Sequence, residues 1–464
     1  MIASALKALR RPLLAVVLAS ASALPVWAET LADTMVDAYR HSALLDQNRA
    51  VLRAADEDVA TAISALRPVL SWVAEYSYQN IEQISVRQAS LQLQAQITLY
   101  DFGRSQFAID AAKETVLATR EALVGIEQDV LLSAVQAYLD VWSAREQVSL
   151  QDNSVRVLGQ EQRAASDRYE VGEITLTDVA QANAALAAAR ANAVAAQGQL
   201  QVAREAYLAL TGHMPKNLSR PPSSPKLPKS LEESRLIAQR THPGILQSQH
   251  SAAAAELGVA SAKAEGNPII TGQIGAGSMR GNSVTRPDKV TTDSFSASVS
   301  MSQQLYSGGR LSAAQRKAMA QRDVARASLL NTSRQVSQAV GTAWAQISVN
   351  RAQIGAIDEQ ISAAQQAYDG VREEATLGAR TTLDVLDAEQ SLLEARANKI
   401  TAEANLQLAH YQLLSSMGLL TVEHLKLGIP TYDPSAYYNA VRNAPVTSSQ
   451  GKSLDRVLRA IGRE

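Results

Sequence analysis

The stretch ASLQLQAQITLY, residues 89–100, alternates between apolar and polar side chains almost without interruption. Leucine, alanine or isoleucine fills every odd position from 91 to 99, and glutamine or threonine fills every even position from 92 to 98. In an extended chain the two sets point to opposite faces. Strands of about 9 to 11 residues with an apolar outer face and a polar inner face are typical of outer-membrane β-barrels. A soluble antiparallel sheet with one wet face is the more common alternative.

Similar alternation occurs over residues 70–78 and 295–302, and more weakly over the glycine-rich segment 270–278. Four strands cannot close a barrel, and an open sheet edge in lipid would leave backbone N–H and C=O groups without hydrogen-bond partners. A membrane sheet of this kind therefore requires several chains, although the strands do not determine how many.

The N-terminus has the pattern of a secretory signal peptide. Lys7 and two arginines precede an apolar run over residues 13–24, and a small-residue pattern ends just before Glu29. We therefore expect cleavage at that point and export of the chain. Export, together with the lack of a helix placed to cover a soluble sheet, favours the membrane interpretation of the strands.

The chain is internally duplicated. A shift of 200 residues superposes the first helical segments, and a shift of 206 residues superposes LYDFGR (99–104) on LYSGGR (305–310) and Gly172 on Gly378. Duplication at this scale means that each half builds the same structural unit. Each half is expected to contain a helix, two strands, a long helix, a turn and a further helix.

The expected boundaries follow from the duplication. A signal peptide over 1–28 precedes a first repeat over 29–212, an equatorial linker over 213–229, a second repeat over 230–418, and an equatorial segment with a mobile tail over 419–464. The first repeat is expected to contain strands at about 69–99, a long helix over 105–169, a tip turn over 170–175 and a helix over 176–211. The second repeat is expected to contain strands at about 269–305, a long helix over 310–375, a tip turn over 376–381 and a helix over 382–417. In the tail, only Leu454 to Ile461 has the pattern of a short helix.

The lengths of the helices predict how the chain runs. Apolar residues recur every seven positions from Leu31 to Leu66, and Pro68 ends this first helix. The long helix of about 65 residues would measure roughly 98 Å at 1.5 Å per residue. The two shorter helices, of about 36 residues each, would match it when stacked end to end. The chain should therefore climb half the height, descend the full height, and climb back to the middle.

The two tip turns, VGEITLTDVAQA (171–182) and LGARTTLDVLDA (377–388), have the same helix-stop and helix-start signals. Gly172 and Gly378 can supply the left-handed residue that ends a helix. Thr175 with Asp178, and Thr381 with Asp384, have the spacing of a helix capping box. A structural role for these aspartates is the simpler interpretation, and it is compatible with a second role in a gate.

These features together resemble the outer membrane efflux protein family, the TolC-like outer membrane factors. The resemblance is carried by RYEVGEITLTDVAQA and ATLGARTTLDVLDAE, and by the strand-to-helix junction motifs with Tyr100, Gly103, Arg104, Tyr306, Gly309 and Arg310. It covers nearly all of the mature chain. It implies a mainly α homotrimer in which a 12-stranded outer-membrane β-barrel continues into a long α-helical coiled-coil barrel across the periplasm of a Gram-negative bacterium.

The resemblance also implies a function, as the exit duct of a tripartite export system for type I protein secretion or multidrug efflux. Its partners would be a periplasmic adaptor (membrane fusion) protein, an inner-membrane ABC or RND transporter, and outer-membrane lipid. Asp384 and Asp387 would form two carboxylate rings at a periplasmic gate. Arg380 would tie neighbouring tip helices, with Thr177 and Asp178 as its partners.

This sequence departs from the family at one gate position. The family's tyrosine three residues before the second glycine is Ala375 here, whereas Tyr169 occupies the equivalent place in the first repeat. A tyrosine hydrogen bond from that position is therefore not expected. The gate should either open more easily or depend more on Arg380.

Other function classes find little support. The formal net charge of −1 gives no reason to expect a nucleic-acid partner, and the absence of cysteine excludes disulfides. The six histidines show no metal-ligand spacing, and no catalytic arrangement stands out, so neither a metal, a cofactor nor an enzyme is expected. The alternative to a duct is a periplasmic coiled-coil scaffold without a pore.

Overall fold

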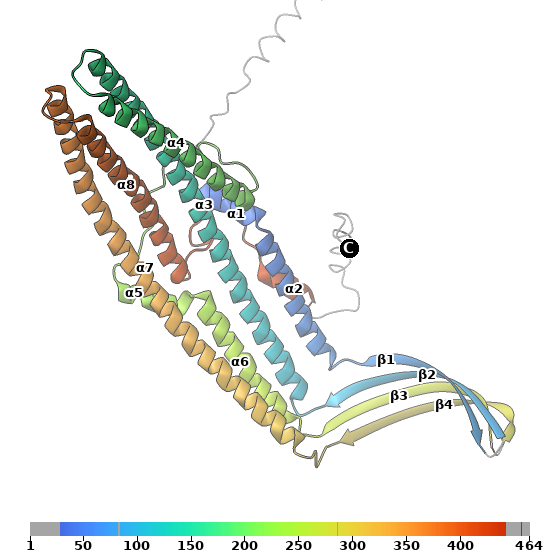
Figure 1. Ribbon diagram of the computed structural model, residues 1–464. Helices are drawn as coiled ribbons and strands as arrows, with labels where there is room; N and C mark the ends of the chain where they lie inside the picture. The colour runs from blue at the N-terminus through green and yellow to red at the C-terminus, as the bar shows by residue number, and fades with distance from the viewer. Residues whose placement is uncertain (1–27, 82–83, 285, 442–455, 457–464) are drawn as a thin grey trace, which may run out of the picture.

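The computed structural model describes residues 28–81, 84–284, 286–441 and 456, and it shows an elongated bundle of helices with a β-sheet at one end (Figure 1). The elements, in chain order, are α1 (Leu31–His41), α2 (Ala43–Ser64), β1 (Val69–Ile81), β2 (Ile84–Tyr100), α3 (Arg104–Glu170), α4 (Leu176–Thr211), α5 (Leu231–Thr241), α6 (Pro243–Ala264), β3 (Ile269–Ser283), β4 (Arg286–Ser302), α7 (Arg310–Thr376), α8 (Thr382–Ser416) and α9 (Pro434–Val441). Nearly all of the expected signal peptide lies outside the described residues. So does the tail beyond residue 441, including its expected short helix at 454–461, with the exception of residue 456.

The sheet contains four antiparallel strands in the order β1-β2-β3-β4. The strands are 13 to 17 residues long, which exceeds the 9 to 11 residues expected from the alternation. The registers pair Trp72 with Leu93, Leu93 with Ala276 and Ala276 with Phe295, so the apolar positions of all four strands lie on one face. Trp72 and Phe295 are 70% and 76% exposed, respectively. The single chain therefore presents an apolar sheet face to its surroundings.

The long helices confirm the climbing and descending path. Helices α3 and α7 each contain 67 residues, about 100 Å at 1.5 Å per residue, while α4 and α8 contain 36 and 35 residues. Helix α4 lies beside the half of α3 that is remote from the sheet, and α2 lies beside the half next to it (Figure 1). Among the described helices, none combines the length and the hydrophobicity needed to cross a membrane.

The prediction of one continuous first helix from Leu31 to Leu66 was wrong. The helix is interrupted at Ser42, where the backbone is extended and the side-chain oxygen accepts a hydrogen bond from the N–H of Leu45 at 3.2 Å. His242 interrupts the second repeat in the same way, and Pro243 begins α6. The residue before a proline avoids the helical conformation, so the second break had a sequence signal. The first break is made by a serine that caps α2, and the heptad spacing of apolar residues continues across it, so the pattern does not reveal the break.

The largest hydrophobic core lies at mid-height. Four large side chains in this core are less than 2% exposed: Leu131 and Tyr138 of α3, Leu31 of α1 and Leu413 of α8. The segment after α8, including the fully buried Leu420, joins this core. Helix α9 packs against α2, an element that the loss of periodicity after residue 418 did not predict. The middle of the molecule is therefore where the two repeats and the linker meet.

Candidate functional site

The two tip turns have the same backbone. Gly172 and Gly378 adopt left-handed φ angles of 79° and 77°. The amide of Gly172 donates to the carbonyl of Tyr169 at 3.0 Å, and the amide of Gly378 donates to the carbonyl of Ala375 at 3.2 Å. These contacts satisfy the carbonyl groups left free at a helix end. The predicted role of both glycines is confirmed.

Both capping boxes are also confirmed. One carboxylate oxygen of Asp178 accepts from the amide of Thr175 at 2.9 Å and from its hydroxyl at 2.7 Å. Asp384 accepts from the amide and the hydroxyl of Thr381, each at 2.9 Å. The threonine hydroxyl lowers the pKa of Asp178, and the Thr381 amide lowers the pKa of Asp384. Both carboxylates are therefore held in their charged form at the positive ends of their helices.

Arg380 lies on the surface of the second turn and binds within its own repeat. Its Nε is 2.8 Å from Oε2 of Glu374. Within the described part of this single chain, no hydrogen bond or ion pair joins Arg380 to Thr177 or Asp178. The expected tie between neighbouring tip helices therefore stays a prediction. The structure adds Glu374 as an Arg380 partner that the sequence motif did not indicate.

Asp387 is exposed one helical turn beyond the cap. It borders a groove between α3, α4 and α8 whose lining includes alanines and polar side chains of α4 and leucines such as Leu386. Helices α4 and α8 therefore leave Asp387 free to face solvent or another chain. Its predicted position near the mouth of the tip is consistent with this exposure, while a ring of three such carboxylates stays a prediction.

Two arginines join the repeats at the tip. Arg168 donates from Nη1 to the carbonyl oxygen of Ala375 at 3.2 Å, and Arg372 lies 3.3 Å from Glu161. The Ala375 side chain is buried against α3 and α8. Sequence reasoning treated position 375 only as a missing tyrosine. Its backbone oxygen is instead a contact point between the two halves.

The strand-to-helix junctions are built alike. Gly103 and Gly309 have left-handed φ angles of 85° and 88°, directly before α3 and α7 begin at Arg104 and Arg310. Asp101 accepts from the amide of Ser105 at 2.7 Å. In the second repeat, the hydroxyl of Ser307 accepts from the amide of Leu311 at 3.2 Å.

The tyrosines at the two junctions are exposed. Tyr100 and Tyr306 are 56% and 87% exposed at the ends of the apolar strands, as an aromatic at a membrane interface would be. Arg310 contacts Gln304 at 3.0 Å and Glu265 at 3.7 Å. The junction glycines therefore turn the chain, and the tyrosines remain available to contact lipid.

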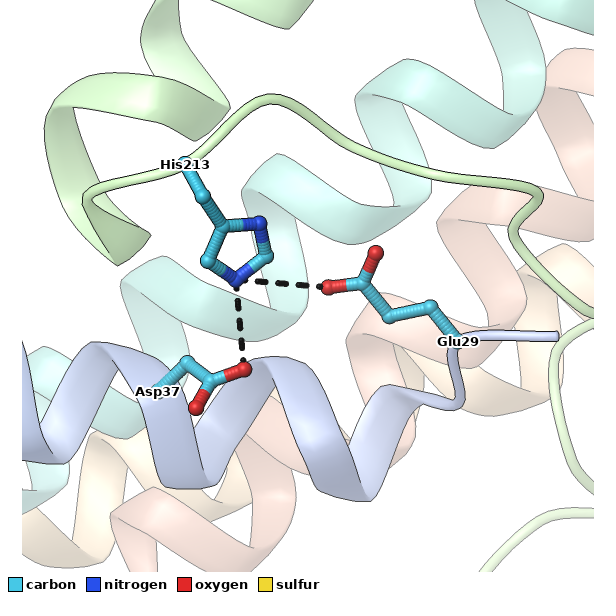
Figure 2. A group of neighbouring side chains, drawn as sticks. All are labelled: Glu29, Asp37 and His213. Carbon is cyan, nitrogen blue, oxygen red and sulfur yellow. Dashed lines mark hydrogen bonds and ion pairs between the residues drawn. The ribbon is translucent and has the colours of Figure 1, made fainter. Parts of the chain in front are cut away.

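A third group of side chains lies at mid-height, where sequence reasoning found no site. Glu29, Asp37 of α1 and His213 lie close together, with their polar ends converging (Figure 2). His213 Nε2 is 3.2 Å from Asp37 Oδ2 and 3.7 Å from Glu29 Oε1. These residues are up to 184 positions apart in the sequence. Their proximity depends on the fold, so no motif could have indicated it.

Comparison with known proteins gives one consistent result. The model of the outer membrane efflux protein family matches residues 35–213 and 237–419, which are the two repeats. The outer membrane efflux protein BepC of Brucella suis is 34% identical over 416 residues, covering 89% of this chain and 91% of the relative. The outer membrane protein TolC of Escherichia coli is 25% identical over 448 residues, covering 91% of this chain and 90% of the relative.

Solved structures agree at the level of the fold. The outer membrane protein VceC of Vibrio cholerae superposes with a TM-score of 0.72 at 22% identity, covering 84% of this chain and 96% of that one. The CmeC outer membrane channel of Campylobacter jejuni superposes with a TM-score of 0.75 at 15% identity, covering 87% and 88%. The arrangement of long helices and a terminal sheet is therefore shared with outer membrane channels.

Proposed function

Because this chain belongs to the outer membrane efflux protein family, we propose that three copies assemble into the exit duct of a tripartite export system, gated at the periplasmic tip. The family consists of outer membrane channel proteins, and members such as TolC lie in the outer membrane of Gram-negative bacteria with a large periplasmic portion. The export role that we propose is type I protein secretion or multidrug efflux.

The observation that carries the proposal is the sheet. Within the described residues, β1 and β4 each pair with a strand on only one side. The apolar residues of all four strands share a face, and large members such as Trp72 and Phe295 are exposed. In lipid every strand edge needs a hydrogen-bonding partner. Pairing β4 of one chain with β1 of the next satisfies the edges, and three chains of four strands make a 12-stranded barrel.

The proposed gate lies at the opposite end, in the second tip turn. Asp384 is held charged by the Thr381 cap, and Asp387 is exposed one turn farther along α8. Three copies of each would form two rings of negative charge around the axis. Such rings attract cations and repel anions. Arg380, bound to Glu374 at the surface, is placed to exchange that partner for a residue of a neighbouring chain or of an adaptor protein.

The partners we propose are a periplasmic adaptor protein at the tips and, through it, an inner-membrane ABC or RND transporter. The chain has no cysteine, so single cysteines introduced at Glu173 and Ala379 would be unique attachment points in the two turns. Cross-linking in cells from these positions should capture an adaptor protein, whose identity then distinguishes the transporter class. A cysteine at the exposed Ser71 in β1 is the control that should capture none.

The duct is tested by extraction and conductance. We expect the exported protein to require detergent, to migrate as a heat-modifiable trimer, and to form ion channels in planar lipid bilayers. The alternative is a periplasmic scaffold without a pore. Release of a folded, soluble protein by osmotic shock, with no conductance in bilayers, would favour that scaffold and overturn the duct.

A further inference from the structure

The Glu29–Asp37–His213 cluster joins three separate segments of the chain at mid-height (Figure 2). Glu29 precedes α1 and is held by the linker, because its amide donates to the carbonyl of Asn217 at 2.9 Å and its carbonyl accepts from Ser219 at 3.0 Å. Asp37 lies within α1, and His213 follows the last residues of α4. The cluster is far from both tip turns and from the sheet.

The hydrogen bonds of His213 determine which of its nitrogens faces the carboxylates. Nδ1 is 3.1 Å from the carbonyl oxygen of Met214, which can only accept, so Nδ1 carries a proton. Nε2 faces Asp37 and Glu29 and donates to Oδ2 of Asp37 at 3.2 Å, because a carboxylate also only accepts. A metal ion bound there would replace that proton. A histidine that donates one ring N–H to a carbonyl and directs the other nitrogen at carboxylates has the orientation of a metal ligand.

Glu29 is held by further hydrogen bonds. It is 7% exposed, its Oε1 accepts from the hydroxyl of the fully buried Tyr207, and its Oε2 accepts from the amide of Lys216 at 3.0 Å. The Tyr207 hydroxyl is in turn 2.9 Å from that of Thr34. Buried partners of this kind orient a ligand before an ion arrives.

The two carboxylates of the cluster share one side-chain ion-pair partner. Among the described residues, the ion pairs of Glu29 and Asp37 are both with His213. A divalent cation would displace the Nε2 proton of His213 and bring a second positive charge to the two carboxylates. Asp37 and His213 are about one-third exposed, so an ion could enter from water and keep a water ligand.

The two distances to His213 Nε2 suit zinc. The three ligand atoms lie within 4.8 Å of one another, with His213 Nε2 at 3.2 and 3.7 Å from the two oxygens. Tetrahedral ligands about 2.1 Å from Zn²⁺ lie about 3.4 Å apart. Imidazole with carboxylates is a ligand set that zinc accepts readily.

We propose that Glu29, Asp37 and His213 form a zinc site that fastens the start of the mature chain to the linker between the repeats. Three ligands from three segments would join α1, the end of α4 and the linker at the height where the repeats meet. The site is independent of the gate, so a failure of either proposal leaves the other standing.

The test uses the full exported trimer in detergent, stripped of metal with a chelator and titrated with Zn²⁺ against a chromophoric zinc indicator. We expect one zinc per chain in the unmodified protein, and an affinity at least about 10- to 100-fold lower in Asp37→Asn and His213→Gln, the range seen when even a supporting residue is lost. Glu29 is left unchanged because it adjoins the expected cleavage site.

His250→Gln is the matched control. His250 lies 2.8 Å from Glu114 and is outside the three-residue cluster, so it offers a histidine–carboxylate pair without a third ligand. Zinc should raise the thermal unfolding temperature of the unmodified protein and of His250→Gln, but not that of His213→Gln. If His213→Gln does not fold, Tyr207→Phe keeps all three ligands and should still weaken binding. Stoichiometric zinc absent from the unmodified protein, or equal affinity in all variants, would show that the cluster is an ion pair only.

Discussion

The two tip turns share a backbone and differ in the charged residues that surround it. Both contain a left-handed glycine and a complete capping box. Before the first turn, Arg168 reaches the carbonyl of Ala375 in the other repeat. The matching position in the second repeat is Glu374, which binds Arg380 in its own turn. Duplication has therefore preserved the residues that fold the turn, while the residues that make contacts beyond it have diverged.

The same contrast recurs near the sheet, in helices α2 and α6. Asp56 of α2 is 1% exposed, and neither of its carboxylate oxygens has a hydrogen-bond partner among the described residues. Glu256, 200 positions later, is exposed and lies 2.6 Å from Arg326. One position of the repeat thus holds a buried acid in the first copy and a solvated ion pair in the second.

The largest expected effect comes from Asp56. Burial raises the pKa of its carboxyl to about 6 from 3.8, and two pKa units correspond to about 3 kcal/mol. Partial solvent screening reduces this, so we expect Asp56→Asn to raise the free energy of unfolding at pH 7.5 by about 2 kcal/mol. Thermal unfolding of the purified protein measures it.

The raised pKa of Asp56 also predicts how the free energy of unfolding changes with pH. The folded protein binds more protons than the unfolded chain between pH 3.8 and about 6, so the wild type loses stability as pH rises through that window. The advantage of Asp56→Asn should therefore disappear as the pH falls from 7 to about 4. Glu256→Gln, the matched exposed acid, should change stability by less than about 0.5 kcal/mol. Equal effects of the two substitutions would contradict the contrast between the helices.

The next largest effect on stability is expected from the left-handed glycine that both tip turns contain. Gly172→Ala and Gly378→Ala should each cost about 1 to 2 kcal/mol, because an L-residue in the left-handed region is strained. An added Cβ would meet no atom within 4 Å at either glycine, so the two costs should be equal. Gly370→Ala, in the interior of α7 with equally open space, should stabilise the helix instead. Hydrogen exchange of the backbone amides near the tips measures the change in local stability in all three variants.

A smaller effect is expected from the caps. Thr175→Ala and Thr381→Ala each remove the acceptor for an N-terminal amide, at a cost of about 1 kcal/mol. Faster hydrogen exchange confined to the first turns of α4 and α8 would be the signature. A clear difference between the two variants would mean that the turns are less alike than their hydrogen bonds indicate.

Much of this architecture could be predicted from local patterns. Alternation identified the strands, the glycines and capping boxes located both tips, and counting residues gave the relation between long and short helices. The break at Ser42 was missed because one serine cap leaves the heptad spacing intact. Contacts between distant segments, such as Arg168 with Ala375, depend on how helices pack and have no local signal.

The smallest change in stability is expected from Arg380→Ala and Arg168→Ala. Arg380 lies at the surface with one exposed partner, and exposed ion pairs contribute little to stability.

The two arginine variants should differ in their effect on channel conductance. Arg380→Ala should raise the resting conductance of the channel, because it removes a charge from the proposed latch. Arg168→Ala, which loses a contact within one chain, should leave resting conductance closer to that of the wild type. Equal conductance in Arg380→Ala and wild type would count against the latch.

The central claim, that Asp384 and Asp387 of the second tip turn form the carboxylate rings of the gate, is tested most directly by single-channel ion selectivity in planar bilayers. The wild type should prefer cations. Asp384→Asn/Asp387→Asn should lose that preference. Asp178→Asn removes an expected partner of Arg380 and weakens the cap of the first turn, but it removes no ring carboxylate, so it should keep the cation preference. Unchanged cation preference in the double variant would contradict the assignment of the gate.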